Sequence, residues 1–446
     1  MMKFKESHGS IMSELLLWQK MPTQTVVKDT YEIKVHPTAS SYDEGLLNFE
    51  IPPQQRAMMN NIEIVTSFKV KKGNANLGED DQCTIVNSIA GSMWSLVDVV
   101  FGDRVNLTQS MRNSYAYQSF FNHVLNSDKN REDYLFRTQC FCMDTGVDKA
   151  DSESLVYKGE NTVTNIGGAK RAERIANSKT VTVSSRLQCP LFSTSKALPP
   201  NIKVRLSLTK NDDKFLLMTD GDDYRVILET VHLNVTYIQP EEMVLSMIEE
   251  RLAKEAAPYF VPKNEIIIKP ISQSGRIVRI NDLFPSKIPR HAFFCIQRSS
   301  CFEGTRSSNP YTFIPFGKLE IYIDGKPYFN DGSLEVTYRS IDGKKVYDED
   351  GVLLKQLYKT TGRENRGHGL IDSSNIQQNY IAAVSLSGDR SSCTAPYLSP
   401  QSRASTQLLI DFGYDINVSE DMILIIYAQY DRIIKINSER ELEIID

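Results

Sequence analysis

The sequence has no long hydrophobic run and few cysteines. Its first apolar stretch, residues 15–18, is far shorter than a signal-peptide core or a membrane-spanning helix, which needs about 20 residues. The seven cysteines are scattered and odd in number, which is untypical of a disulfide framework. We therefore predict a protein without a membrane span that is made in the reducing cytosol or nucleus.

An excess of basic charge is also lacking. The chain has 51 Lys and Arg against 56 Asp and Glu, a net charge of −5, which argues against a protein that mainly neutralises phosphates over a broad surface. Any contact with DNA is therefore local. The remaining composition, 41% hydrophobic and 24% charged, is ordinary for a soluble folded protein. The length of 446 residues suggests about two or three domains.

Recognisable catalytic motifs are missing as well. There is no Gly-x-Ser-x-Gly elbow, no phosphate loop ending in Gly-Lys-Ser/Thr and no Gly-x-Gly-x-x-Gly after a strand. No His-x-His occurs among the six histidines, although a cupin needs paired histidines and a carboxylate inside its barrel. A site assembled from distant loops would leave no such local trace. We predict no enzymatic activity and no bound cofactor.

Two groups of side chains come nearest to a metal site. In each, the spacing is poor or the ligands are too few, so buried or incidental cysteines are the favoured interpretation and no metal site is predicted. The two groups are His123, Cys140, Cys142 and His291, Cys295, Cys301.

Acidic pairs are plentiful and lie in polar turn regions. Solvated loops are therefore favoured over carboxylate dyads or calcium ligands. The pairs are Asp80-Asp81, Asp212-Asp213, Asp222-Asp223 and Asp348-Glu349-Asp350.

Short runs of β-branched and aromatic residues, separated by Gly, Pro, Asn and Asp, dominate the chain and predict an all-β protein. In the first half we expect strands at 30–35, 46–51, 62–70, 94–101, 104–107, 180–187, 202–208 and 226–238. In the second half we expect them at 265–270, 277–280, 292–297, 318–323, 381–386, 407–412 and 422–434.

An amphipathic helix is expected between the two halves. Pro240 suits the first helical turn, Glu241 and Glu242 suit the positive end of the dipole, and Pro258 and Pro262 are expected to stop the helix. Its apolar residues recur at spacings of three and four. We predict a first domain at 25–239, a linker helix at 240–257 and a second domain at 258–446, each domain about the size of one sandwich.

The two halves share a hairpin landmark. In the first half it is the turn at Gly102-Asp103, followed by a helix expected at 111–125. In the second half it is Asp324-Gly325, where Asp-Gly tolerates the positive φ of a type I′ turn. One shared turn is weak evidence for duplication, but it agrees with the equal sizes of the halves.

Two polar segments, 148–179 and 347–374, are expected to be long loops. Long loops on compact domains are usually functional or mobile, and such loops would offer a surface for contacts between subunits. The first contains Gly167-Gly168, a dipeptide to which we return below.

Two blocks of sequence resemble the major capsid proteins of Polinton (Maverick) elements and adintoviruses. The first comprises residues 12–18, 22–25 and 35–37, and the second comprises residues 92–104 and 113–121. The remainder is similar to that family in length and strand pattern.

This resemblance implies a double jelly roll, which is two eight-stranded antiparallel β-sandwiches with a few short helices. It implies a homotrimer that forms a pseudo-hexameric capsomer and tiles an icosahedral DNA-virus shell. The expected partners are neighbouring capsomers, penton and minor capsid proteins, with at most weak contact with packaged double-stranded DNA. The expected location is the virion capsid, with synthesis in the host cytoplasm and assembly in the nucleus or cytoplasm.

By the same analogy, residues 1–24 form an N-terminal arm at the inner side of the particle. Its apolar anchors would be Leu15, Leu16, Leu17 and Trp18. The alternative, that these residues simply cover the first sandwich, stays open. The maturation protease of related systems prefers double-glycine sites, but Asn165 stands where an apolar residue is expected, so we predict no cleavage at Gly167-Gly168.

Two other functions compete with the shell protein. A jelly-roll binding module, such as a vertex, receptor-binding or glycan-binding protein, is the first alternative, because sandwiches readily host sugar sites. Such a vertex protein would usually have a single sandwich and be shorter. An enzyme of the cupin type is the second.

Overall fold

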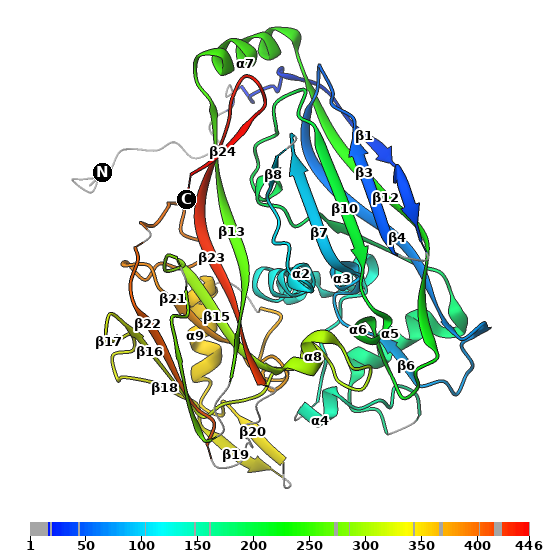
Figure 1. Cartoon of the computed structure of the whole chain (residues 1–446), viewed down its shortest axis with the longest axis vertical. Coiled ribbons are helices and arrows are strands. Elements are labelled where there is room, and N and C mark those ends of the chain that lie inside the picture. Colours follow the sequence, from blue (N-terminus) through cyan, green and yellow to red (C-terminus); the bar gives the residue numbers. More distant parts are fainter. Residues whose placement is uncertain are drawn as a thin grey trace.

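The computed structural model describes residues 17, 20–42, 45–102, 104–146, 149–159, 162–271, 275–284, 286–341, 344–364, 369–400, 402–413 and 422–445. These residues form antiparallel sheets with short helices between them (Figure 1). The expected all-β class is confirmed.

The first half of the chain forms one β-sandwich, called here the first sandwich. One sheet has the order β1-β12-β4-β5, with β9 also paired to β4, and the other has the order β2-β3-β10-β7-β8. The first sheet contains β1 (Val27–Val35), β12 (Tyr224–Pro240), β4 (Met58–Lys72), β5 (Ala75–Asn76) and β9 (Val181–Arg186). The second contains β2 (Ala39–Ser41), β3 (Leu46–Ile51), β10 (Val204–Lys210), β7 (Trp94–Phe101) and β8 (Val105–Asn106). A separate pair joins β6 (Cys83–Ile85) and β11 (Leu217–Thr219).

The second half forms the second sandwich. Its sheets have the orders β13-β23-β15-β21, with β24 on β23, and β14-β22-β16-β17, with β18 on β16. The first sheet contains β13 (Ala257–Pro270), β23 (Met422–Ile436), β15 (His291–Arg298), β21 (Ala382–Ser385) and β24 (Leu442–Ile445). The second contains β14 (Ile277–Asn281), β22 (Thr406–Asp411), β16 (Lys318–Ile323), β17 (Lys326–Pro327) and β18 (Leu334–Glu335). A hairpin of β19 (Tyr338–Ile341) and β20 (Lys344–Tyr347) stands apart from both.

The two sandwiches share one topology. In each, the first long strand pairs with the last, giving β1-β12-β4-β9 and β13-β23-β15-β21. The facing sheets correspond as β3-β10-β7-β8 and β14-β22-β16-β17. The predicted hairpins occupy equivalent places, as β7–β8 and β16–β17. Asp324 and Gly325 have φ values of 47° and 74°, as a type I′ turn requires.

Helices connect the strands. The elements of the first half are α1 (Ile89–Ser92), α2 (Ser114–Asn126), α3 (Glu132–Gln139), α4 (Lys149–Ser152), α5 (Ile166–Ile175) and α6 (Asp213–Leu216), with 3₁₀ turns at Lys129–Arg131, Ala176–Ser178 and Pro190–Ser193. The remaining helices are α7 (Glu242–Lys254), α8 (Ser299–Glu303) and α9 (Val352–Thr361). Helix α7 lies across one end of the molecule, between the last strand of the first sandwich and the first strand of the second (Figure 1).

Three sequence-based expectations are corrected by the structure. Segments 148–179 and 347–374 are not wholly loops, because they contain helices α5 and α9, whose apolar faces are buried. Pro258 and Pro262 do not simply end a helix but lie within β13, which begins eight residues before the expected strand. Prolines are tolerated there because β13 is an edge strand.

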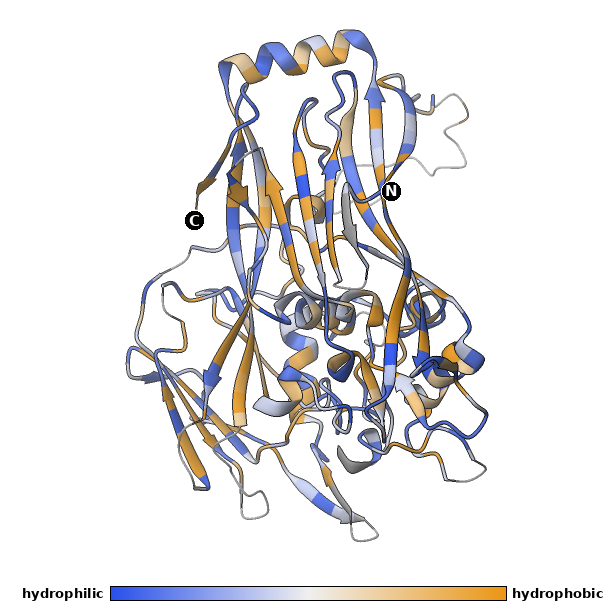
Figure 2. Ribbon diagram, turned by 45° about the vertical axis from the view of Figure 1, so that its right-hand side comes forward, coloured by the Kyte–Doolittle hydropathy of each residue, from blue (hydrophilic) through white to orange (hydrophobic). Residues whose placement is uncertain are grey.

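The core follows from alternation along the strands. In β4, buried and partly exposed side chains alternate over most of its 15 residues, as expected for a strand with one face in the core. Strand β15 is instead buried along nearly its whole length, and β23 is buried without interruption over its first seven residues, so both faces are covered there. Hydrophobic residues accordingly run along the strands of both sandwiches (Figure 2).

Candidate functional site

Helix α2 carries aromatic side chains that join the two sandwiches. Phe120 stacks on Tyr311 with ring centroids 4.2 Å apart, and Phe121 stacks on Tyr427 at 5.1 Å. The hydroxyl of Tyr117 donates a hydrogen bond of 2.8 Å to the carbonyl of Pro310. All these rings are buried, so the contact between the sandwiches is a continuous part of the core.

A buried ion pair lies beside this aromatic contact. Arg171 on α5 is fully buried, and its guanidinium donates to the carboxylate of Asp144 and to the carbonyl of Cys142. From the second half of the chain, the Asn309 amide donates to the same carboxylate at 2.9 Å. A hydrogen-bonded network therefore links α5 to the second half of the chain.

The double glycine of α5 makes this arrangement possible. A Cβ on Gly167 would lie 2.1 Å from the carbonyl oxygen of Met143, and a Cβ on Gly168 would lie 2.9 Å from the ring of Tyr157. Both glycines are buried. Gly167-Gly168 is thus a packing feature within a helix.

The outward edge of β13 is covered by side chains from the first sandwich. The Gln109 amide bonds both backbone groups of Ile266, at 2.7 Å and 2.9 Å. The Gln118 amide donates to the carbonyl of Asn264 at 3.0 Å, and Lys196 donates to the carbonyl of Pro258 at 3.0 Å. The backbone N–H and C=O groups of successive residues point to opposite edges of a strand. The bonds above therefore show that the backbone groups of the even-numbered residues point to the outward edge of β13.

Three of those outward positions are prolines. They are Pro258, Pro262 and Pro270, which have no N–H group to offer another strand. Side-chain capping and prolines together close this edge to strand addition.

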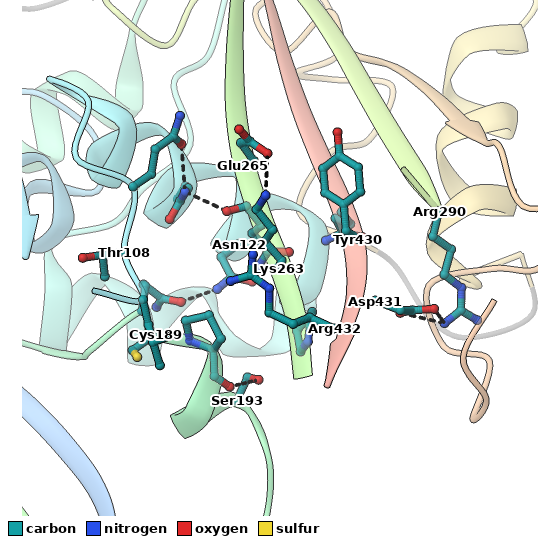
Figure 3. A pocket seen from close by; sticks show the side chains of 18 of the residues that line it. Thr108, Asn122, Cys189, Ser193, Lys263, Glu265, Arg290, Tyr430, Asp431 and Arg432 are labelled. Atoms are coloured by element: carbon teal, nitrogen blue, oxygen red, sulfur yellow. Dashed lines mark hydrogen bonds and ion pairs between the residues drawn. The ribbon is translucent and has the colours of Figure 1, made fainter. Parts of the chain in front are cut away.

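A groove of about 600 Å³ runs between the two sandwiches beside β13 (Figure 3). Its charged groups pair with one another: Lys263 lies 3.2 Å from Glu265, and Arg290 lies 3.4 Å from Asp431. Much of the remaining lining consists of side-chain amides from Asn106, Gln109, Gln118, Asn122, Asn126, Gln188, Asn264 and Gln429.

The two cysteines that line this groove are not activated as nucleophiles. Burial raises the pKa of the Cys189 thiol to about 12 and that of Cys393 to about 12, so both are protonated at neutral pH. Burial lowers the pKa of His291, whose Nε2 lies 2.9 Å from the carbonyl of Ser391. The described lining thus offers hydrogen bonds and paired charges but no thiolate nucleophile.

The two candidate metal clusters are not built as ligand sets. His123 is buried, with its ring stacked on Phe141 and Nδ1 against the carbonyl of Ser119. His291 and Cys295 lie in β15, where both are buried. Within the described ranges, no three His, Cys, Asp or Glu side chains are placed to hold a metal ion.

The acidic pairs divide into surface groups and one buried group. Asp81 accepts a hydrogen bond of 2.8 Å from Lys72, and this bond lowers the pKa of Asp81. Asp348 corrects the expectation of a solvated loop, because it is buried and accepts bonds from the backbone of Leu353 and Leu354 at the start of α9. Burial raises the pKa of Asp348.

The expected anchors of the N-terminal arm lie mostly beyond the described residues. Leu15, Leu16 and Trp18 are outside them, and Leu17 has 75% of its surface exposed. Residues 20–30 are exposed throughout. The structure assigns no partner to Leu17, so its expected role stays a prediction.

Sequence reasoning did not find the contacts of Asp144, Arg171 and Asn309. A basic run beside a double glycine was visible, but its partners are far away in the sequence. The helix expected at 111–125 is present as α2 (Ser114–Asn126), but it is buried on nearly all sides, with Tyr117, Phe120 and Phe121 among its buried residues.

Comparisons with known proteins identify the fold. No protein-family model matches the sequence, and no curated protein matches it. Among solved structures, a chain from the cryo-EM structure of the Sputnik virophage is similar with a TM-score of 0.61 and 11% identity, covering 98% of this chain and 93% of that one. The mavirus major capsid protein is similar with a TM-score of 0.56 and 11% identity, covering 100% and 95%. The Faustovirus major capsid protein gives a TM-score of 0.58 and 6% identity, covering 94% and 92%.

The chain has the double jelly-roll fold. The first sandwich is the first jelly roll and the second sandwich is the second, and the groove of Figure 3 lies between the two jelly rolls. Among the residues described, no helix is both long and apolar enough to cross a bilayer.

Proposed function

We propose that the chain is a major capsid protein whose copies trimerise into pseudo-hexameric capsomers and tile the icosahedral shell of a DNA virus. The observation that carries the proposal is the repetition of one jelly-roll topology within one chain. Three copies around a threefold axis place six similar jelly rolls in a ring. A trimer thereby acquires a hexagonal outline, which tiles a surface.

The fixed relation between the jelly rolls supports this role. A capsomer needs a constant angle between its units, and the buried aromatic contact of α2 and the network of Asp144 supply one. Burial keeps both thiols of the described groove protonated, as is compatible with a structural role for this region.

The proposal extends to partners and location. Neighbouring capsomers, penton proteins and minor capsid proteins are the expected partners, and the net charge of −5 favours at most weak contact with packaged double-stranded DNA. No disulfide joins the cysteines of the described residues, which supports synthesis in the host cytoplasm and assembly there or in the nucleus.

We also propose that residues 1–24 act as an arm toward neighbouring capsomers or minor proteins. Leu17 and Met21 have 75% and 83% of their surface exposed, so both apolar side chains are available to such partners. Leu15, Leu16 and Trp18 would complete this apolar set.

The test is to purify the full chain, measure its mass in solution and image it by negative-stain electron microscopy. We expect a mass three times the 50.6 kDa of one chain, and particles with hexagonal outlines. A monodisperse monomer at every concentration would contradict the capsomer. A monomer that binds glycans would favour the alternative, a receptor-binding or glycan-binding jelly-roll module.

A further inference from the structure

A second cavity, of about 640 Å³, lies within the second jelly roll between α9 and residues 328–335. It has the size of an ordinary small-molecule site. In Figure 1, α9 and the neighbouring strands β16, β17 and β18 lie away from the end of the molecule that carries α7. The cavity is separate from the groove between the jelly rolls, with which it shares no lining residue.

Two lysines of α9 line this cavity. Lys355 and Lys359 are exposed and stand one helical turn apart, about 6 Å along the helix axis. Neither has an ion-pair partner among the described carboxylates. Gln356, which also lines the cavity, has an amide free of described partners.

The other charged groups leave the cavity positive. Arg390 adds a third cation, while Asp331 and Glu335 are the acidic residues of the lining. Glu335 lies 3.5 Å from Lys318, outside the lining, and accepts from Ser333. Three cations thus face two carboxylates, one of which is already paired.

An aromatic wall stands among these charges. The guanidinium of Arg390 lies 4.8 Å from the ring centroid of Tyr328 and donates to the carbonyl of the same residue at 2.9 Å. The Tyr328 hydroxyl is tied to the carbonyl of Ser385 at 2.9 Å. Phe329 packs edge-on against Tyr328, with centroids 5.0 Å apart, and is half-buried. The wall is therefore fixed before any ligand arrives.

The lining also contains a buried polar group without a partner. Thr360 is 2% exposed, and its hydroxyl has no hydrogen-bond partner among the described residues. Buried hydroxyls are nearly always hydrogen-bonded, so this atom marks a place where a partner is missing.

We propose that this cavity binds a sulfated glycan. The two unpaired ammonium groups, one turn apart, match separate anionic groups along a chain better than one compact phosphate. The half-buried ring of Phe329 suits the apolar face of a sugar ring, and the free amide of Gln356 suits its hydroxyls. No glycine-rich loop lines the cavity to cradle a phosphate through backbone N–H groups, so a nucleotide fits less well.

This proposal goes beyond shell formation. The lining comes from one chain alone, so the purified protein binds the glycan whether or not capsomers form.

The experiment measures binding of a heparin octasaccharide to the full chain by calorimetry. We expect the double substitution K355Q/K359Q to weaken binding at least about tenfold, because two charge-assisted hydrogen bonds are lost. Glutamine keeps helix propensity, and an unchanged melting temperature verifies the fold. The control K28Q/K203Q removes the same charge from exposed positions of the first jelly roll and leaves binding unchanged.

Binding of further ligands distinguishes a sulfated glycan from other anionic ligands. Desulfated octasaccharide and inorganic sulfate are both expected to bind at least about tenfold more weakly than the sulfated octasaccharide. The first lacks the anionic groups that the lysines recognise, and the second lacks the sugar ring. Equal binding of inorganic sulfate, tighter binding of single-stranded DNA, or an equal loss in both double variants would overturn the proposal. So would a wild-type chain that does not bind the octasaccharide.

Discussion

Arg171 and Asp144 form an ion pair at a depth where charges are seldom found. Their side chains are 0% and 6% exposed. Such burial is tolerated because Asn165 and Asn309 also donate to the carboxylate, at 2.8 Å and 2.9 Å, and the guanidinium bonds two backbone carbonyls, those of Ile85 and Cys142. The ion pair therefore contributes to stability mainly as part of this complete hydrogen-bonded network.

Removing one member should show this directly. We expect Asp144→Ala to lower the free energy of unfolding by about 3–5 kcal/mol, because Arg171 is left as an uncompensated buried charge. Denaturant unfolding followed by fluorescence measures the change. The matched control is Asp133→Ala, which breaks an exposed pair with Arg137 and should cost less than about 1 kcal/mol. Equal losses in the two variants would refute the importance of burial.

Contacts of single residues were the hardest feature to predict from the sequence. Asp144 and Asn309 are 165 positions apart, and nothing near either residue indicates the other. The burial of Asp348 was missed because its acidic neighbours Glu349 and Asp350 are exposed and suggest a solvated loop. A partner far along the chain decides the first case, whereas hydrogen bonds from the start of α9 hold Asp348 in the second.

Among the elements, α5 depends on a residue that local propensity disfavours. The segment around Gly167-Gly168 was expected to be a loop because it is polar, and glycine, which lowers helix propensity, gives no local indication of a helix. Close packing against the backbone at Met143 explains why glycine stands there.

We expect Gly167→Ala to destabilise the protein although alanine is the better helix former. The added Cβ would lie 2.1 Å from a backbone oxygen, which cannot move as a flexible side chain can, so the loss should reach about 3 kcal/mol. Thermal melting measures it. Gly388→Ala is the control, because a Cβ there has nothing within 4 Å and the change should stay within about 0.5 kcal/mol. A stabilised Gly167→Ala protein would contradict this packing.

Strands were easier to predict than helices. Alternation placed the core of β4, β10 and β12, because a half-buried strand must show period two. The first part of β13 was missed, since Pro258 and Pro262 ordinarily interrupt strands and are accepted only where their missing N–H groups face outward.

At the scale of the whole molecule, the two jelly rolls are coupled through buried aromatic rings, together with the network of Asp144 and the side-chain bonds to β13. Sequence patterns indicated two blocks of similar size and a shared hairpin, and the two hairpins occupy equivalent places in the two sheet orders. They did not indicate how the blocks meet, because the rings of α2 and those of Tyr311 and Phe313 become neighbours only after folding.

We expect Phe120→Ala to uncouple the two jelly rolls. The substitution should lower the free energy of unfolding by about 3–5 kcal/mol, and the lost packing lies at the contact between the jelly rolls. The two jelly rolls should therefore unfold separately, giving two denaturant transitions in place of one. Phe49→Ala is the control, since Phe49 is equally buried but lies in β3 within the first jelly roll, and should weaken that unit without the same splitting. A single unshifted transition in Phe120→Ala would show that the coupling lies elsewhere.

The closed edge of β13 has a consequence for solubility. Unprotected edge strands template fibrous aggregation, and the danger grows with local concentration. Prolines at 258, 262 and 270 and the amide of Gln109 remove one such template from every copy. In the proposed shell, where many identical copies lie close together, this edge would not join them by continuous sheets, and side-chain surfaces would determine how the copies meet.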